Sequence, residues 1–293
     1  MSNIGFIGLG LMGSAMVERL QAQGHKLTIM ANRSRPRVDA AVARGATEVS
    51  TPKDVAAAAD IVMLCMDTSA SVEGRLRGAD GVLAGLRPGA VVIDFGTSLP
   101  ASTRTLGEEA TAAGGTYLDG PLGRTPAHAV EGLLNIMCSG DMAAFEKVKP
   151  VLQDLGENVF HLGALGSGHT IKLLNNFFGM TVANAMAEAF AVADVAGIER
   201  SALYDVMSAG PLRSGMMDFV KGYAVDGDPS QLAFSIQNAA KDVGYYAQMT
   251  QDAGVQSVMS AGALKGLTAA TEDGRGDDMV SQIVDYYAQQ FKG

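Results

Sequence analysis

A glycine-rich turn lies near the start of the chain, between a strand-like run and a helical one. Ile4-Gly5-Phe6-Ile7 has the composition of a buried strand, and the segment from Gly8 to Gly13 follows it directly. A Gly-x-Gly-x-x-Gly turn lets the backbone approach a pyrophosphate at the N-terminus of the next helix. A second strand-like run begins at Leu27, which completes the context that this motif requires. We therefore expect a dinucleotide to contact Gly8, Leu9, Gly10, Leu11, Met12 and Gly13.

Beyond this turn, the first part of the chain alternates strand-like and helical runs, whereas the rest shows helical spacing alone. The strand-like runs are 4–8, 27–31, 61–66, 91–95, 117–119, 133–138 and 158–162. Helical runs are 13–23, 37–44, 102–113 and 143–155 in the first part, and 180–196, 201–207, 233–253 and 279–291 after it. This order predicts an α/β fold with two domains. Residues 1–163 would form a Rossmann domain with a doubly wound parallel sheet, and residues 164–293 an all-α domain, joined by a long interdomain helix.

Charge and cysteine usage exclude several classes of protein. The chain has 31 acidic and 22 basic residues, a net charge of −9, and no basic run, so we expect neither nucleic acid nor an anionic membrane as a partner. Its two cysteines, Cys65 and Cys138, lie in apolar stretches, and the four histidines are dispersed, which argues against a metal site or a disulfide framework. The long apolar stretch 171–197 carries several polar side chains and predicts a buried helix rather than a membrane span. The pattern is typical of a cytoplasmic protein.

The residues after the second strand-like run bear on the type of dinucleotide. A site that prefers NAD usually ends this strand with an acid that binds the ribose 2′-hydroxyl. This chain has Asn32-Arg33-Ser34 there, with Arg35 and Arg37 just beyond. A guanidinium pairs well with phosphate oxygens, so this segment favours NADP(H), with NAD(H) as the alternative.

Other polar residues follow strand-like runs and are placed to approach the same cofactor. Met66 and Asp67 follow the run that begins at Ile61, and Thr97 follows the run 91–95. Ligands of open α/β sheets bind at the carboxyl ends of the strands, where these residues would lie. The pair Lys241-Asp242 stands on a later helical run, and its pattern alone indicates a solvated helix face.

Three polar side chains interrupt the apolar helix that follows Gly166-Ser167-Gly168. Lys172, Asn175 and Asn176 share neighbouring parts of one helix face because they are three and four residues apart. A lysine in an apolar setting can exchange a proton with an alcohol or carbonyl oxygen, and carboxamides can orient it or bind a substrate. From the residues alone, a polar contact between domains explains this cluster equally well.

A short loop, Gly123-Arg124-Thr125, follows the run 117–119 at its carboxyl end. Arg124 could bind an anionic group there, with Thr125 and the amide of Gly123 assisting. The alternative is an ordinary surface loop that contains an arginine.

Taken together, the motifs resemble the β-hydroxyacid dehydrogenases, the family of 3-hydroxyisobutyrate dehydrogenase and tartronate semialdehyde reductase. The resemblance covers nearly the whole chain and rests on four motifs in order. They are the segment from Gly5 to Gly13, Asp119-Gly120-Pro121, Gly166-x-Gly168-x-x-x-Lys172-x-x-Asn175-Asn176, and Lys241-Asp242. The resemblance implies a nicotinamide cofactor without a metal, Lys172 as general acid/base, Asn175 and Asn176 as orienting groups, and Lys241 near cofactor and substrate. It also implies a homodimer or homotetramer that assembles through the helical domain.

One motif departs from the family pattern. Most members carry Ser-Gly-Gly where this chain has Gly123-Arg124-Thr125. The Gly-Arg-Thr form resembles the sulfolactaldehyde reductase branch, in which the arginine holds a sulfonate or a distal carboxylate. The expected reaction is therefore hydride transfer between a nicotinamide and a short aldehyde or alcohol with an anionic tail, of the sulfolactaldehyde or succinic semialdehyde type. The alternatives are the 3-hydroxyisobutyrate or tartronate semialdehyde reaction and, in another class, a catalytically silent scaffold that binds the cofactor.

Overall fold

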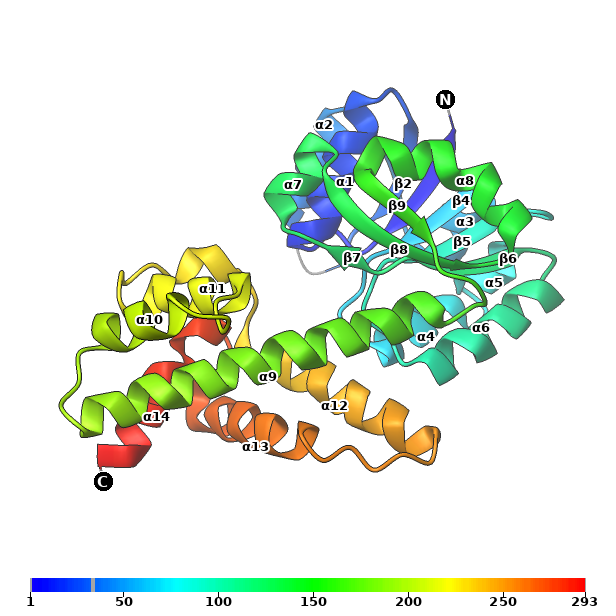
Figure 1. The fold of residues 1–293 in the computed structure, drawn as a ribbon. Helices are drawn as coiled ribbons and strands as arrows, with labels where there is room; N and C mark the ends of the chain where they lie inside the picture. Colours follow the sequence, from blue (N-terminus) through cyan, green and yellow to red (C-terminus); the bar gives the residue numbers. More distant parts are fainter. Residues whose placement is uncertain (1, 33–34, 293) are drawn as a thin grey trace. The chain divides into compact units, whose positions relative to one another are not determined.

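The computed structural model describes residues 2–32 and 35–292 (Figure 1). Its contacts divide the chain into two compact units, Met1–Lys172 and Leu173–Gly293. The predicted boundary between residues 163 and 164 precedes the helix α9 (Ser167–Val195), whereas the contacts divide the chain within this helix.

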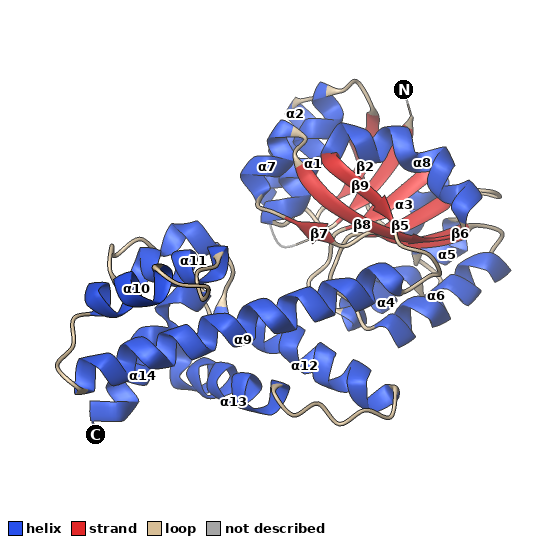
Figure 2. Ribbon diagram, viewed as in Figure 1, coloured by secondary structure: helices blue, strands red, loops and turns tan. Residues whose placement is uncertain are grey.

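The first unit is built on a mixed sheet of nine strands within the described residues, shown in red in Figure 2. The strands follow the order β3-β2-β1-β4-β5-β6-β8-β7, and β9 pairs with β8. The strands are β1 (Asn3–Ile7), β2 (Lys26–Met30), β3 (Thr47–Val49), β4 (Ile61–Leu64), β5 (Val91–Asp94), β6 (Thr116–Asp119), β7 (Leu122–Gly123), β8 (Leu134–Gly140) and β9 (Gly156–His161). From β3 to β6 all neighbours are parallel, as the sequence predicts, but β8 runs antiparallel to both β6 and β7.

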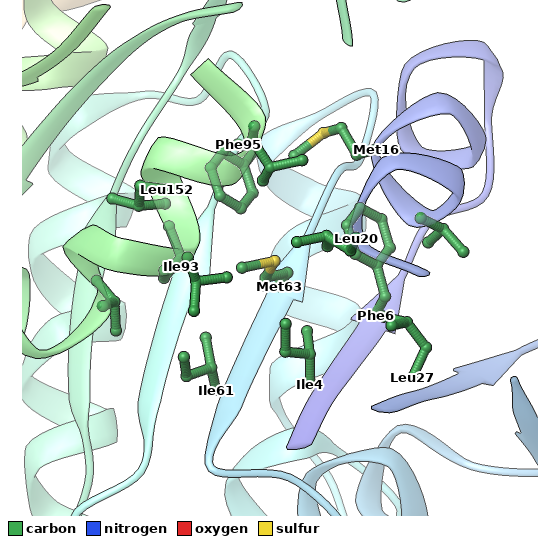
Figure 3. Close-up of a cluster of buried hydrophobic side chains, with 14 of the residues drawn as sticks. Ile4, Phe6, Met16, Leu20, Leu27, Ile61, Met63, Ile93, Phe95 and Leu152 are labelled. Atoms are coloured by element: carbon green, nitrogen blue, oxygen red, sulfur yellow. The ribbon is translucent and has the colours of Figure 1, made fainter. Parts of the chain in front are cut away.

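Helices cover both faces of this sheet. They are α1 (Leu11–Ala22), α2 (Arg35–Ala43), α3 (Pro52–Ala57), α4 (Ser69–Leu76), α5 (Val82–Gly85), α6 (Pro100–Ala112), α7 (Pro126–Glu131) and α8 (Met142–Leu155). Successive residues of a strand point to opposite faces, so side chains of the central strands pack in two separate cores. Phe6 and Met63 pack with Leu20 of α1 in one core, drawn in Figure 3. Ile7 and Leu64 pack in the other core, beneath helices α3 to α6.

The central strands are apolar without interruption because both of their faces are covered. All four residues of β4 and all four of β5 are buried. Parallel strands of this kind show continuous apolar runs in place of an alternating pattern. The sequence therefore indicates these strands clearly, while it indicates the exposed edge strand β3 poorly.

The second unit is all-helical and packs around the C-terminal part of α9. Its elements are α10 (Arg200–Ser208), α11 (Gly215–Ala224), η1 (Pro229–Leu232), α12 (Ile236–Asp252), α13 (Ser260–Ala270), η2 (Thr271–Arg275), η3 (Val280–Gln282) and α14 (Ile283–Lys292). Met180, Ala183, Ala187 and Phe190 recur along α9 at helical spacing and contact buried residues of the other helices. The unit thus has a hydrophobic core of its own.

Helix α9 differs from the fully buried helix that its apolar composition predicts. Phe178 is 71% exposed, and Leu174, Val192 and Val195 are also exposed. Ile171, Phe178, Ala185 and Val192 follow one another at seven-residue intervals, so they share one face of the helix. The prediction of a buried helix is wrong for this face. Among the described residues, no helix is both long and apolar enough to cross a membrane.

Candidate active site

The glycine turn links the end of β1 to the start of α1. Gly8 has a φ of 104°, and a Cβ there would lie 2.3 Å from the carbonyl oxygen of Cys65. A Cβ at Gly13 would lie 1.9 Å from the carbonyl oxygen of Gly8, so only glycine lets the helix pack this close to the turn. Gly10 has open space where its Cβ would be, and as the N-cap residue before α1 it provides no side-chain cap. The first amides of α1 are thus left without a side-chain acceptor from the N-cap residue.

A cavity of about 470 Å³ lies next to this turn. It is bordered by residues that follow β1, β2 and β4 and by the first turns of α2 and of the helix after β4; they are Gly8, Leu9, Gly10, Asn32, Arg37, Val38, Cys65, Met66, Asp67, Ser71, Gly74 and Arg75. The chain passes from β1 to β2 on one side, and β4 lies on the other side of β1. Such a change of direction opens a crevice at the carboxyl ends of the strands. The topology therefore explains why the cavity lies here.

Six of the predicted cofactor residues border this cavity, and others do not. Those that border it are Gly8, Leu9, Gly10, Asn32, Met66 and Asp67. Leu11, Met12, Gly13 and Thr97 are not among its lining residues, and Lys241 lies in the second unit. Arg33 and Ser34 lie outside the described residues.

The two arginines at the start of α2 have different surroundings. Arg35 contacts Asp39 at 2.5 Å and Glu48 at 2.7 Å, and these hydrogen bonds raise the pKa of its guanidinium above the usual value. Arg37 borders the cavity instead, as does Arg75 of α4. Sequence reasoning missed Ser71, Gly74 and Arg75, because α4 is a short helix with a weak apolar pattern. The position of a helix directly after β4 is the signal that could have indicated them.

Cys65 lies at the edge of the cavity and is not a nucleophile. Burial, and secondarily the charge of Asp94, raises the pKa of the Cys65 thiol to about 12. The sulfur therefore stays protonated at neutral pH, and only a thiolate is a strong nucleophile.

The loop that carries Arg124 has a strained backbone. Arg124 has a φ of 76°, the single positive value at a non-glycine residue among those described. Its Nη1 donates to the carbonyl oxygen of Leu133 at 2.7 Å and to Oε2 of Glu157 at 2.6 Å. The neighbouring Thr125 hydroxyl lies 2.7 Å from Nδ1 of His128, and Gly123 ends the short strand β7.

Helix α9 carries the polar triplet predicted from the sequence. Lys172, the last residue of the first unit, is half-buried. Asn175 is exposed and donates from Nδ2 to Oδ1 of Asn176 at 3.2 Å. Asn176 is buried and donates in turn to Oδ2 of Asp242 at 2.6 Å.

The pair Lys241-Asp242 is not on a solvated face, so that prediction is wrong. Asp242 is 1% exposed, and its Oδ1 lies 3.0 Å from Nζ of Lys241. Next to this pair, Phe177 and Tyr246 stack with ring centroids 3.9 Å apart, which holds α9 against α12. Asn176 therefore connects α9 to the buried carboxylate of Asp242 on α12, a role that the spacing of the residues does not reveal.

Comparisons with known proteins agree with this architecture over nearly the whole chain. Residues 3–163 match the model of the NAD binding domain of 6-phosphogluconate dehydrogenase, and residues 166–287 match the model described as NAD-binding of NADP-dependent 3-hydroxyisobutyrate dehydrogenase. The chain belongs to the 3-hydroxyisobutyrate dehydrogenase family. Its relatives include several named dehydrogenases and reductases, and this chain is an NAD(P)-dependent oxidoreductase that acts on CH–OH groups.

Individual members of the family resemble this chain along almost their full length. The 2-(hydroxymethyl)glutarate dehydrogenase of Eubacterium barkeri is 30% identical over 289 residues, which are 98% of this chain and 95% of that protein. The 3-sulfolactaldehyde reductase of Escherichia coli K12 is 31% identical over 291 residues, 97% of this chain and 95% of that protein. A crystal structure of 3-hydroxyisobutyrate dehydrogenase from Salmonella typhimurium superimposes with a TM-score of 0.84 at 26% identity, covering 98% of this chain and 100% of that one.

The glycine turn and its cavity fit the nicotinamide dinucleotide that the family uses. Gly10 leaves room for a phosphate group, and the uncapped N-terminus of α1 offers amides to its oxygens. Asp67 and Met66 border the same cavity at the end of β4. The residues of the first unit are therefore those that would hold the cofactor in this family member.

Proposed function

We propose that this enzyme catalyses reversible hydride transfer between NADP(H) and a short aldehyde or alcohol that carries an anionic tail. The observation that supports this substrate class is the backbone conformation of Arg124, which is left-handed and suits glycine. A sulfolactaldehyde or succinic semialdehyde type of substrate fits best. The 3-hydroxyisobutyrate and tartronate semialdehyde reactions are the alternatives.

The strain at Arg124 argues that its side chain has a function. A left-handed conformation costs a non-glycine residue about 1–2 kcal/mol. The family pattern that the chain resembles has Ser-Gly-Gly here, and its glycine at the position of Arg124 would avoid that cost. Surroundings that maintain such strain are common at functional sites. This supports a role for the guanidinium beyond that of an ordinary surface arginine.

The contacts of Arg124 leave one edge of its guanidinium for a ligand. Its Nη1 makes both contacts, to Leu133 and to Glu157. Within residues 2–32 and 35–292, its Nε and Nη2 make no hydrogen bond. These two nitrogens form the edge that binds carboxylates and sulfonates through two parallel hydrogen bonds. Thr125 and the amide of Gly123, next to it in the chain, would assist.

The names of two relatives support the same class of substrate. The protein from Eubacterium barkeri is named for a substituted glutarate and the one from Escherichia coli for a sulfolactaldehyde. Both compounds carry an anionic group remote from the reacting carbon. A guanidinium that binds this anionic group would discriminate such compounds from uncharged aldehydes.

In the proposed reaction the chain's own residues bind, orient and exchange a proton. A bound nicotinamide supplies or accepts the hydride. Lys172 donates a proton to the alcohol oxygen as it forms and accepts it in the reverse direction. Asn175, whose carboxamide is exposed, orients the substrate, while Asn176 holds Asn175 in place through its own contact to Asp242. Lys241 pairs with Asp242 at 3.0 Å. Its role near cofactor and substrate is the one that the family pattern implies.

Preference for NADP(H) over NAD(H) follows from the charge around the cavity. Arg37, Arg75 and Asn32 border it, and the arginines carry the positive charge that a 2′-phosphate requires. Arg33 and Ser34, which lie outside the described residues, remain proposed contacts of that phosphate.

Assembly into a homodimer or homotetramer is part of the proposal. The exposed apolar face of α9, which includes Leu174, Phe178, Val192 and Val195, supports it. Contiguous apolar surface of this kind is typical of protein interfaces.

Substituting Arg124→Gly tests the substrate class directly. Loss of a charge-assisted contact should lower kcat/KM for sulfolactaldehyde or succinic semialdehyde by about 10- to 100-fold. An uncharged aldehyde of similar length should be reduced at an unchanged rate. Because glycine relieves the backbone strain, the melting temperature should not fall.

Arg124→Ala is the matched control for this test. It removes the same guanidinium but keeps a Cβ in the left-handed conformation, so it should lose stability relative to Arg124→Gly and show the same change in specificity. Equal losses on charged and uncharged aldehydes would contradict the proposed role. Higher activity of the unmodified enzyme on methylmalonate or tartronate semialdehyde would favour the alternative substrates.

A further inference from the structure

We propose that Asp119, Ser139 and His169 are positioning residues for Lys172. They fix the first turn of α9, and through it the direction in which the Lys172 ammonium reaches the substrate. This inference rests on the proposed role of Lys172 as the proton donor. It assigns a function to a buried polar network that the reaction does not otherwise use.

Asp119 binds the start of α9 from the end of strand β6. Its side chain is fully buried, with an exposed fraction of 0%. Its Oδ1 accepts from the amide of Gly166 at 2.9 Å and from the hydroxyl of Ser139, and its Oδ2 accepts from the amide of His169 at 2.7 Å. A helix begins with amides that need acceptors, and here a side chain of the sheet satisfies them. The carboxylate therefore ties the helix to the sheet in place of a local cap.

Ser139 makes the second tie, from strand β8. It is buried, and its hydroxyl oxygen accepts from the amide of Gly168 at 2.9 Å while the same hydroxyl donates to Asp119. The helix can come this close only because residue 168 is glycine. A Cβ there would lie 2.1 Å from the carbonyl oxygen of Met137 and 2.8 Å from Oδ2 of Asp119. The hydrogen bonds to Asp119 and Ser139 and the close approach at Gly168 thus fix the same position of α9 against the sheet.

His169 fixes the rotation of the helix about its axis. It is fully buried, and its Nδ1 lies 2.7 Å from the hydroxyl of Thr103 on α6. Its Nε2 lies 3.7 Å from Oδ2 of Asp94, and its Nδ1 lies 3.8 Å from Oδ2 of Asp119. The imidazole therefore stands between the ends of β5 and β6 and cannot turn without leaving both carboxylates.

Lys172 follows His169 by three residues, so the two side chains are neighbours along the helix. One residue of an α-helix corresponds to about 100° of rotation, so a small slip at His169 changes where Lys172 points. A displacement of about 1 Å in a reacting group can lower a rate by about 100-fold. The network therefore acts on the proton transfer while it lies apart from the cavity that borders the glycine turn.

The test compares Ser139→Ala and Asp119→Asn with Lys172→Ala, alone and combined. Ser139→Ala and Asp119→Asn should each lower kcat for the preferred aldehyde by about 10- to 100-fold, with its KM and the NADPH Kd changed by less than about threefold. In the Lys172→Ala background, Ser139→Ala should cause no further loss. Because Ser139→Ala removes only one hydroxyl, it still tests the proposal if Asp119→Asn fails to fold.

Val148→Ala is the stability control, because Val148 is buried in the core of the same unit and belongs to none of these contacts. It should lower the melting temperature and leave kcat per folded molecule unchanged. The proposal is overturned if Ser139→Ala leaves kcat intact, or if it lowers kcat equally with and without Lys172. Failure of the proposed function has a different signature, namely that Lys172→Ala alone retains full turnover.

Discussion

Arg35 and Arg37 lie two residues apart on α2, yet their charges meet different partners. Arg35 is on the surface and is bound by Asp39 and Glu48, whereas Arg37 borders the cavity beside the glycine turn. The sequence presents both as equivalent candidates for binding a phosphate. Only the folded arrangement, which brings Glu48 of β3 to Arg35, distinguishes them.

Arg37→Ala should therefore convert the enzyme toward NADH. A charge-assisted contact to phosphate is worth about 1.5–3 kcal/mol, so KM for NADPH should rise by about 10- to 100-fold. KM for NADH should change little, because NADH lacks the 2′-phosphate. Steady-state kinetics with both coenzymes measure this change.

Arg35→Ala is the matched control on the same helix. Its guanidinium is engaged by two carboxylates at the surface, so its loss should leave both KM values unchanged. Equal weakening of NADPH and NADH by Arg37→Ala would contradict the assignment of the 2′-phosphate to this side of the cavity.

Other single residues show what a sequence can and cannot reveal. The glycine turn can be predicted from the sequence, because the backbone conformation at Gly8 and the close approach at Gly13 exclude every residue type other than glycine. The burial of Asp242 cannot be predicted from the sequence. Its partner Asn176 is 66 residues away along the chain, and a charged pair on a helix usually faces solvent. Likewise, nothing local indicates that Arg124 adopts a left-handed conformation or that Glu157 lies beside it.

At the scale of elements, the continuous apolar strands and the longest helices follow from the sequence. Strands β1, β2, β4, β5 and β6 were predicted within one or two residues of their ends because both faces of each are covered. The short helices α3, α5 and α7 were not predicted, since elements of four to six residues show no clear periodicity. The antiparallel edge formed by β7 and β8 was missed for a related reason, because strand direction depends on tertiary pairing.

Helix α9 was predicted as buried, and its exposed apolar face is the most informative disagreement. We expect this face to be covered by a second copy of the chain. Phe178→Lys would place a charge on it, and the substitution should shift the molecular mass in sedimentation velocity from that of an oligomer toward that of one chain.

Val42→Lys is the matched control, because Val42 is an exposed apolar residue of α2 and does not belong to the face of α9. It should leave the mass unchanged. An unmodified protein that sediments as a single chain at micromolar concentration would contradict the assignment of this face.

At the scale of the whole molecule, the order of the motifs along the chain indicated both the fold and the family. The strand order reverses beside β1, and the residues that follow β1, β2 and β4 meet at one cavity. This convergence was predictable because parallel strands end at a common edge. The identity of the substrate was less predictable, since it depends on the contacts of a few side chains in the loop after β7.

In the proposed reaction, Lys172 transfers the proton in an NADP(H)-dependent reduction of an anionic semialdehyde. The most direct test is the kcat of Lys172→Ala with the preferred aldehyde, measured beside Lys265→Ala, which removes an exposed lysine of α13. We expect Lys172→Ala to lose about 100- to 10,000-fold in kcat while it binds NADPH normally, and Lys265→Ala to lose nothing. Retention of full turnover by Lys172→Ala would contradict its role as the proton donor.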